Sequence, residues 1–354
     1  EAYRFGRLSL TLLEQSKAHD AEAMAMGIVY SFANHWQRPL RESIVPLQKA
    51  YISGLKYGNI EHGVLSGFGS VGASMMIGRP LPTVELEMRE FYNRMVDYGQ
   101  DATALTSVPV WQTIMNLLGR CEDPLVLTGE AMEEDDVWKT AIESQNAMAL
   151  HFMDYSKLKV ACLFQAWSVA EDALARMDEH KAIAKGVRAH YSIVECTFLE
   201  GLTNLVLAQK TGKRSYLKAG KQYLKEVCGW HSDGKTDALP YLLCLEAELV
   251  AATDPENLTE VVDAYTQSIA AADACQFVHM EAFSNERAGT LLLARKDIER
   301  GREFLRKARQ LYHRWGARAK VDQLDTKLNN NSNSKKLLTH HSQKMNPPLL
   351  LQKQ

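Results

Sequence analysis

Apolar residues recur at helical spacing along almost the whole chain. Between residues 84 and 98 they stand at steps of four and three, as Val84, Met88, Phe91, Met95 and Tyr98. The same rhythm recurs in 216–230, 258–272 and 298–315, whereas the strict alternation of a β-strand is nearly absent. The pattern predicts an all-α protein whose helices each bury one apolar stripe against neighbouring helices.

The breaks between the predicted helices also recur. Tyr57-Gly58, Tyr98-Gly99 and Trp315-Gly316 each place an aromatic residue and then a glycine at a helix end, where glycine relieves the left-handed cap conformation. The distance from Gly58 to Gly99 is 41 residues, and the distance from Cys275, at the equivalent break, to Gly316 is also 41. A second similarity, between 216–222 and 304–310, has an offset of 88 residues, close to two periods.

A period of 41–44 residues fits two helices and two short turns. We therefore expect an αα-superhelical solenoid of seven or eight tetratricopeptide-like helical hairpins, with a concave groove lined by one helix of each pair. The predicted pairs are 20–38 with 40–57, 60–79 with 84–98, 138–153 with 155–182, 187–211 with 213–230, 237–252 with 257–274, and 277–295 with 298–315; one more helix covers 101–119 and is bent or begun by Pro109.

Two segments depart from the repeat. Residues 121–136 are rich in Asp and Glu and form an acidic interruption of an array that covers 1–328. Residues 329–354 begin with an Asn/Ser run and carry four lysines without an acid, so we expect a disordered tail. The chain starts at Glu1 within a helical pattern, and we expect it to be a piece of something longer or a gene model that lost its start.

Charge and cysteine usage exclude several classes of protein. With 41 Lys and Arg against 43 Asp and Glu, the net charge is -2, so we expect no nucleic-acid partner held by bulk electrostatics. No window holds 18 uninterrupted apolar residues, so we expect no transmembrane helix and no membrane partner. The six cysteines form no C-x-x-C pair, which is typical of buried thiols in a reducing, cytoplasmic compartment.

One glycine-rich motif invites a catalytic interpretation. Residues Gly67-Phe-Gly69-Ser-Val-Gly72 match G-x-G-x-x-G, a phosphate cradle when it follows a strand and opens a helix. Here the sequence from Ile60 onward is helical, so the required strand is missing. The small residues Gly63, Gly67, Ser70 and Ser74 instead form one stripe, which favours close packing of a neighbouring helix.

Other candidate chemistry is weak. No Walker loop, protein-kinase signature or G-x-S-x-G motif occurs. His151 with Asp154, and His231 with Asp233, are expected to be surface or packing residues, and His340-His341 in the tail would make a poor metal site. We therefore expect no catalytic residue, no cofactor and no metal centre.

A basic stretch over 295–320 holds ten Lys and Arg and three acids. Arg302, Arg306, Arg309 and His313 share one helix face there, which could dock an acidic partner or a phosphate. A solvated outer face is the favoured interpretation because charge runs on helices are usually of that kind. Aromatic residues that could stack on bases are missing from this face.

Parts of the sequence resemble one family. The segments 283–295, 304–308 and 312–321, the last reading Tyr-His-Arg-Trp-Gly-Ala-Arg-Ala-Lys-Val, are similar to the tetratricopeptide-like region of large multidomain signalling proteins. Residues 3–8, His35-Trp36 and 47–55 resemble the start of that region. Such proteins also carry a protein kinase-like domain, an AAA/STAND-type ATPase, a GAF sensor and a histidine kinase. The resemblance covers about residues 1–328.

The resemblance implies a non-catalytic scaffold or regulatory arm in signal transduction. Its partners would be other proteins or adjacent domains of the same polypeptide, and the catalytic residues of the family lie in modules that this sequence does not contain. Two alternatives stay open. The chain could be a fragment of a parent with ATP-binding histidine or serine/threonine kinase activity, or a helical domain that senses a small molecule in its groove.

Overall fold

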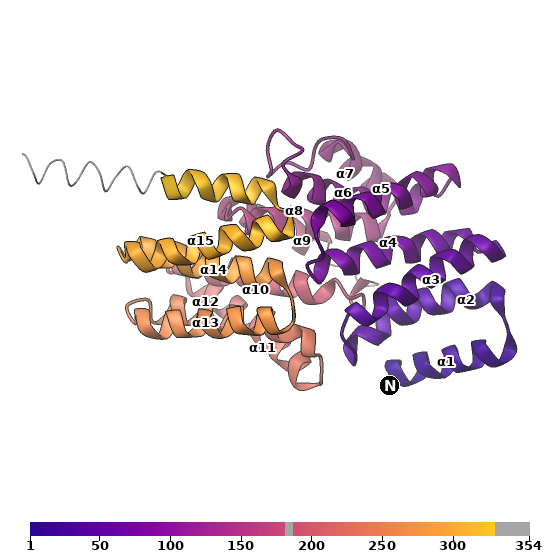
Figure 1. Cartoon of the computed structure of the whole chain (residues 1–354), viewed down its shortest axis with the longest axis horizontal. Helices are drawn as coiled ribbons and strands as arrows, with labels where there is room; N and C mark the ends of the chain where they lie inside the picture. Colours follow the sequence, from indigo (N-terminus) through magenta and orange to yellow (C-terminus); the bar gives the residue numbers. More distant parts are fainter. Residues whose placement is uncertain (181–186, 330–354) are drawn as a thin grey trace, which may run out of the picture.

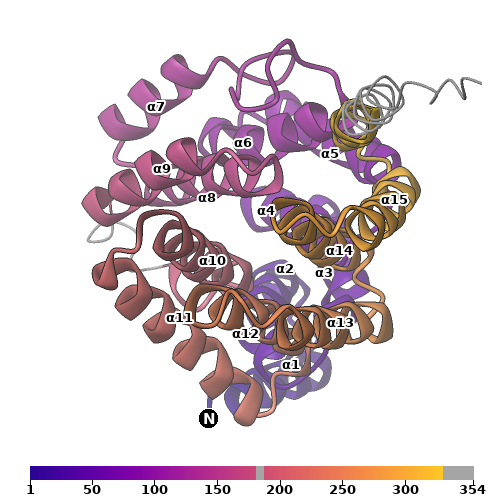
Figure 2. The same ribbon diagram turned by 90° about the vertical axis from the view of Figure 1, so that its left-hand side faces the viewer.

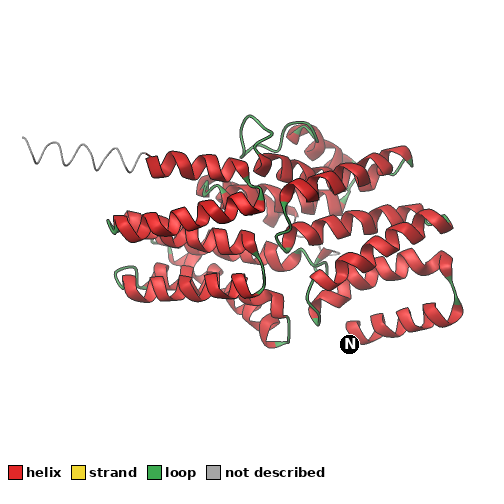
Figure 3. Ribbon diagram, viewed as in Figure 1, coloured by secondary structure: helices red, strands yellow, loops and turns green. Residues whose placement is uncertain are grey.

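The computed structural model describes residues 1–180 and 187–329, and within these ranges every regular element is a helix (Figure 3). The expectation of an all-α protein is confirmed. The predicted tail lies outside the described residues, except for Asn329. No helix in the described part of the chain is long and apolar enough to cross a membrane.

Most helices follow one another through short turns, whereas residues 119–133 form a longer connection between α6 and α7 (Figure 1). A π-helical turn over Val29–Ala33 and a 3₁₀ turn over Asn34–Trp36 follow α2, and a further helical segment covers 318–329. The bounds are α1 Ala2–Ser16, α2 His19–Ile28, α3 Arg41–Tyr57, α4 Ile60–Met76, α5 Leu81–Asp97, α6 Asp101–Leu118, α7 Glu134–Glu143, α8 Ala147–Leu163, α9 Trp167–His180, α10 Ile193–Thr211, α11 Arg214–Ser232, α12 Leu239–Thr253, α13 Leu258–Ala274, α14 Val278–Ala294 and α15 Ile298–Trp315.

The glycine turns lie where the sequence predicted them. Gly58, Gly99 and Gly316 have φ angles of 85°, 63° and 91°, the left-handed region that glycine enters without strain. Other turns use glutamine at the same conformation, for example Gln165 with φ of 56° and Gln276 with φ of 59°. The sequence signal is therefore weakest at the turns that lack glycine.

One predicted pair of helices is wrong. The sequence placed helices at 138–153 and 155–182, but α8 runs without a break through Asp154, and the breaks lie at Gln145 and Gln165. Burial explains the error, because 15 of the 17 residues of α8 are buried, and no apolar stripe marks its limits. Helix α7 begins at Glu134, within the acidic segment 121–136 and four residues before the predicted helix at 138–153.

The helices separate into a buried and an exposed set. From α4 to α14 the even-numbered helices form the interior, whereas the odd-numbered helices cover them with a single buried stripe each (Figure 2). The outer α11, for instance, buries only Gly220 and Val227. The core therefore lies along the even-numbered helices.

Regions far apart in the sequence close over this core. The Arg41 guanidinium donates to the carbonyl of Cys275 at 2.7 Å, and the Tyr191 hydroxyl donates to the carbonyl of Gly69 at 2.8 Å. A Cβ at Gly316 would lie 2.7 Å from Cδ of Pro82, so the turn after α15 touches the start of α5. These contacts hold α3 against the turn after α13, α4 against the residues before α10, and α5 against the turn after α15.

Candidate functional site

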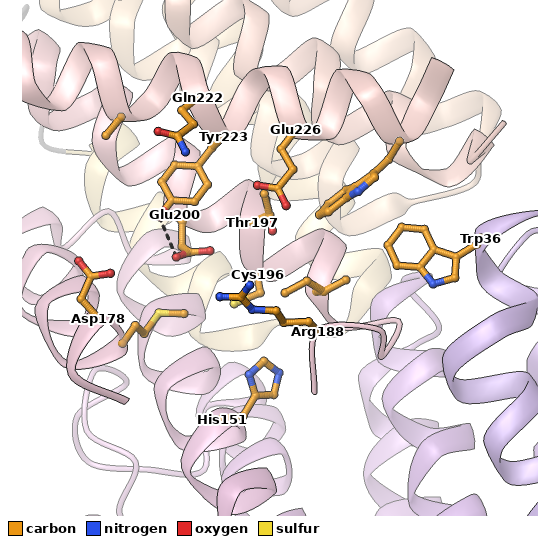
Figure 4. A pocket seen from close by; sticks show the side chains of 14 residues that line it. Trp36, His151, Asp178, Arg188, Cys196, Thr197, Glu200, Gln222, Tyr223 and Glu226 are labelled. Atoms are coloured by element: carbon orange, nitrogen blue, oxygen red, sulfur yellow. Dashed lines mark hydrogen bonds between the residues drawn. The ribbon is translucent and has the colours of Figure 1, made fainter. Parts of the chain in front are cut away.

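A cavity of about 660 Å³ opens between α9, α10 and α11 (Figure 4). Aromatic, apolar and charged side chains share its wall. The lining residues are Trp36, His151, Met177, Asp178, Arg188, Ile193, Cys196, Thr197, Glu200, Ala219, Gln222, Tyr223, Glu226 and Trp230. Its size is that of a site for a small molecule or for one or two side chains of a peptide.

Helical spacing explains why these residues share one wall. On α10 the lining positions are 193, 196, 197 and 200, and on α11 they are 219, 222, 223, 226 and 230. Both sets advance by three or four residues, so each lies on one face of its helix. Two rigid helices therefore hold most of the site.

Charge is unevenly distributed around the cavity. Carboxylates of Asp178, Glu200 and Glu226 line it together with the guanidinium of Arg188. The Tyr223 hydroxyl donates to Glu200 Oε1 at 3.0 Å, as the dashed line in Figure 4 shows. Burial, and then the neighbouring Glu200 carboxylate, raise the pKa of Tyr223, so its hydroxyl stays protonated and fixes the carboxylate.

Trp36 brings the N-terminal region into the site. Its ring meets that of Trp230 edge to face, with centroids 5.5 Å apart. The Trp36 indole N–H donates to the carbonyl of Phe32 at 3.1 Å, and the Lys235 ammonium lies 5.4 Å from the ring centroid. The Trp36 ring is thus held by contacts with Trp230, Phe32 and Lys235. The two tryptophans are 194 positions apart in the sequence.

His151 and Cys196 look like a catalytic pair but are both held neutral. His151 Nε2 lies 3.0 Å from the Ser192 hydroxyl, and burial lowers the pKa of His151 to about 4. Burial also raises the pKa of Cys196 well above its ordinary value. A reactive cysteine requires a thiolate, usually favoured by a nearby cation. Neither side chain is therefore in the charged form that such a pair would need.

The basic face predicted from the sequence lies elsewhere, on α15. Arg306 and His313 are exposed, and Arg309 donates from Nη2 to Asp325 at 2.8 Å. Arg302 shares this helix, and none of the four residues lines the cavity. One member of the basic stretch departs from a solvated face: Lys320 is fully buried and donates to Glu286 at 2.9 Å.

The glycine-rich motif lies inside α4 and packs helices together, as the missing strand predicted. A Cβ at Gly63 would lie 3.1 Å from Cα of Gly54 in α3, and a Cβ at Gly67 would lie 2.8 Å from Phe91 of α5. Adding a side chain would push these helices apart. No phosphate-binding loop can form where the backbone amides are already used within a helix.

His151 and Asp154 are both buried, so they are packing residues. Asp154 Oδ2 lies 2.8 Å from Nδ1 of His180, and burial raises the pKa of Asp154 to about 6. His231, the other histidine considered, is half-buried near the end of α11. His340 and His341 lie outside the described residues. Among the residues that are described, no group of three or more His, Cys, Asp or Glu is arranged to hold a metal ion.

Comparisons with known proteins found no similar protein. No protein-family model, curated protein or solved structure matches the sequence. No sequence motif marks the cavity. The only signal for it was the polar character of positions 222, 223 and 226 on α11 and of position 200 on α10, a pattern that any solvated helix face shares.

Proposed function

We propose that the chain is a non-catalytic binding module: a tetratricopeptide-like helical array that serves as a scaffold or regulatory arm for protein–protein or interdomain contacts in cytoplasmic signal transduction. Three observations support it. Consecutive helices form hairpins, buried and exposed helices alternate, and the aromatic–glycine turns recur at the spacing of a repeat. Stacked hairpins of this kind present rigid surfaces to partners.

The cavity between α9, α10 and α11 carries the proposal. Its aromatic rings and carboxylates are fixed on helices, whereas its histidine and cysteine are neutral and the Tyr223 hydroxyl is already donated to Glu200. Aromatic faces beside carboxylates can bind the side chains of a docked peptide, cationic ones above all. The site therefore favours recognition of a polypeptide segment.

A small molecule is the second candidate ligand. The volume of about 660 Å³ suits a metabolite, and Trp36 would close over it from another part of the chain. A ligand held in this way would link the N-terminal region to α11, which is how a sensing domain transmits occupancy.

Selection of a displayed peptide library on the purified chain tests the proposal. Selected peptides are then titrated by calorimetry against the unmodified chain and against Gln222→Trp, which fills the cavity from α11. We expect the affinity to fall at least about tenfold, because the indole occupies the space of the bound side chain.

Lys221→Trp is the matched control, since Lys221 is the exposed neighbour of Gln222 and does not line the cavity. Two results would argue against a peptide ligand and for a small molecule. One is equal peptide affinity of the two variants. The other is a library that yields no peptide while one metabolite raises the melting temperature of the chain. Turnover of ATP by the purified chain that is lost in Gly67→Ala would contradict a non-catalytic role.

A further inference from the structure

A second hollow, of about 740 Å³, lies over α11, α12 and α13 and is separate from the cavity described above. Its floor is apolar and consists of half-buried side chains, among them Leu224 of α11, Leu243 and Val250 of α12, and Ala264 of α13. We call this hollow the α12–α13 groove. Half-exposed leucines side by side are the kind of surface that a partner covers.

Helical spacing gives the groove its shape. On α12 the lining positions 243, 246, 249 and 250 lie on one face, and on α13 the positions 260, 263, 264 and 267 do so as well. The two faces form neighbouring ridges, and α11 bounds the far side through Leu224. A further helix can lie along such ridges in the way that helices pack within a bundle.

The charges that line the groove are all negative. They are the carboxylates of Glu246, Glu260 and Asp263, and no Lys or Arg is among the lining residues. All three side chains are exposed, and no salt bridge found in the described ranges involves them. Glu260 accepts a hydrogen bond from Asn257 at 2.9 Å, which leaves its charge in place.

We propose that the α12–α13 groove binds an amphipathic helix of a partner protein that carries Lys or Arg along the edges of a leucine-rich face. The apolar face of that helix covers the floor, and its cations meet Glu246, Glu260 and Asp263. Complementary charge fixes the choice of partner, because an acidic helix on the same floor places like charges together.

Calorimetric titration with a synthetic amphipathic peptide built only of leucine and lysine tests this proposal. The comparison peptide has glutamate at every lysine position. We expect the Leu/Lys peptide to bind, with an affinity that falls as salt is added, and the Leu/Glu peptide to give no measurable heat. Hydrogen exchange should show new protection within 243–267.

Reversal of the groove's charge is the decisive variant. In Glu246→Lys/Asp263→Lys we expect the affinity for the Leu/Lys peptide to fall at least about tenfold, and in Glu246→Gln/Asp263→Asn by a smaller factor. Asp273→Lys is the matched control, because Asp273 is an exposed acid of α13 that does not line the groove. The affinity of the Asp273→Lys variant for the Leu/Lys peptide should equal that of the unmodified chain.

Several results would overturn the proposal. They are equal binding of the Leu/Glu peptide, an affinity that charge reversal does not lower, or protection that lies outside 243–267. Dimerisation of the free chain that charge reversal abolishes would identify a second copy as the occupant instead. Loss of Leu/Lys binding in Gln222→Trp would place the peptide in the other cavity, so the two sites can fail separately.

Discussion

Helices α8 and α11 are both well formed, yet the sequence reveals only one of them clearly. In α11 the buried residues are two of 19, and a single stripe faces the core. In α8 the buried residues are 15 of 17, and they include Lys157, Lys159, His151 and Asp154. A stripe identifies a helix only when its polar residues face water, so α11 follows the pattern of a surface helix and α8 does not.

Buried ion pairs join several of the inner helices. Lys159 of α8 lies 2.9 Å from Glu195 of α10, and Arg287 of α14 lies 2.6 Å from Glu248 of α12. These partners are paired and hydrogen-bonded because an isolated buried charge is very costly. Charges of α11 such as Lys218 and Lys225 are exposed. The inner helices are therefore joined by ionic contacts as well as by apolar ones.

The largest effect that we predict concerns the single stripe of an outer helix. Trp315 of α15 is fully buried, as are Leu305 and Tyr312. Trp315→Ala should lower the free energy of unfolding by about 3–5 kcal/mol, because it removes a large aromatic ring from the core. Urea denaturation measures the loss. Arg306→Ala, an exposed substitution on the same helix, should change the free energy of unfolding by less than about 0.5 kcal/mol.

Hydrogen exchange locates that damage. We expect lost protection in α14, in α15 and at the start of α5, which the turn at Gly316 touches. A loss of protection from hydrogen exchange that is confined to α15 would show that the C-terminal helices are not coupled to α5.

A smaller loss should follow when one buried ion pair of the inner set is broken. Lys159→Met leaves the Glu195 carboxylate buried with the Tyr155 hydroxyl as its remaining donor. Unfolding by urea should show a destabilisation of about 3 kcal/mol, the lower end for a broken buried pair. A stability equal to that of the unmodified chain would show that Glu195 is reached by water.

Acid should weaken the inner helices before the outer ones. Burial lowers the pKa of His151 to about 4 and the pKa values of His190 and His279 to about 3, from the ordinary value of 6.5. Because the folded-state pKa values are depressed, the unfolded chain binds protons first as the pH falls below 6.5, and stability is lost from there down to the folded-state values. The raised pKa of Asp154 offsets part of this loss of stability, because the folded chain protonates Asp154 before the unfolded chain does.

As the pH falls from 8 to 6, the three histidines together should lower the free energy of unfolding by about 2 kcal/mol. Chemical denaturation at each pH measures it, and His151→Gln should flatten the slope. A free energy of unfolding that does not change between pH 8 and pH 6 would mean that these histidines are solvated.

The smallest effect should be on α11, the outer counterpart of α8. Lys225→Met removes an exposed charge, and we expect a change of less than about 0.5 kcal/mol because water already solvates it. The pair Lys159→Met and Lys225→Met therefore compares one substitution in two environments. Similar losses in both would remove the distinction between inner and outer helices.

The sequence by itself determined most of the helices and their turns, because both depend on neighbouring residues. The stripe from Leu305 to Trp315 predicted α15, and the glycines at 58, 99 and 316 predicted three turns with left-handed caps. The missing strand before Gly67 was enough to place the glycine-rich motif inside a helix.

Only the tertiary structure decided which polar residues are buried and where the hollows lie. Lys320 stands within a basic stretch but is buried against Glu286, 34 residues away in the sequence. Trp36 meets Trp230, 194 residues further along the chain, and both rings line the cavity. These features need partners distant in the sequence, and local periodicity carries no information about which distant helix covers a given face.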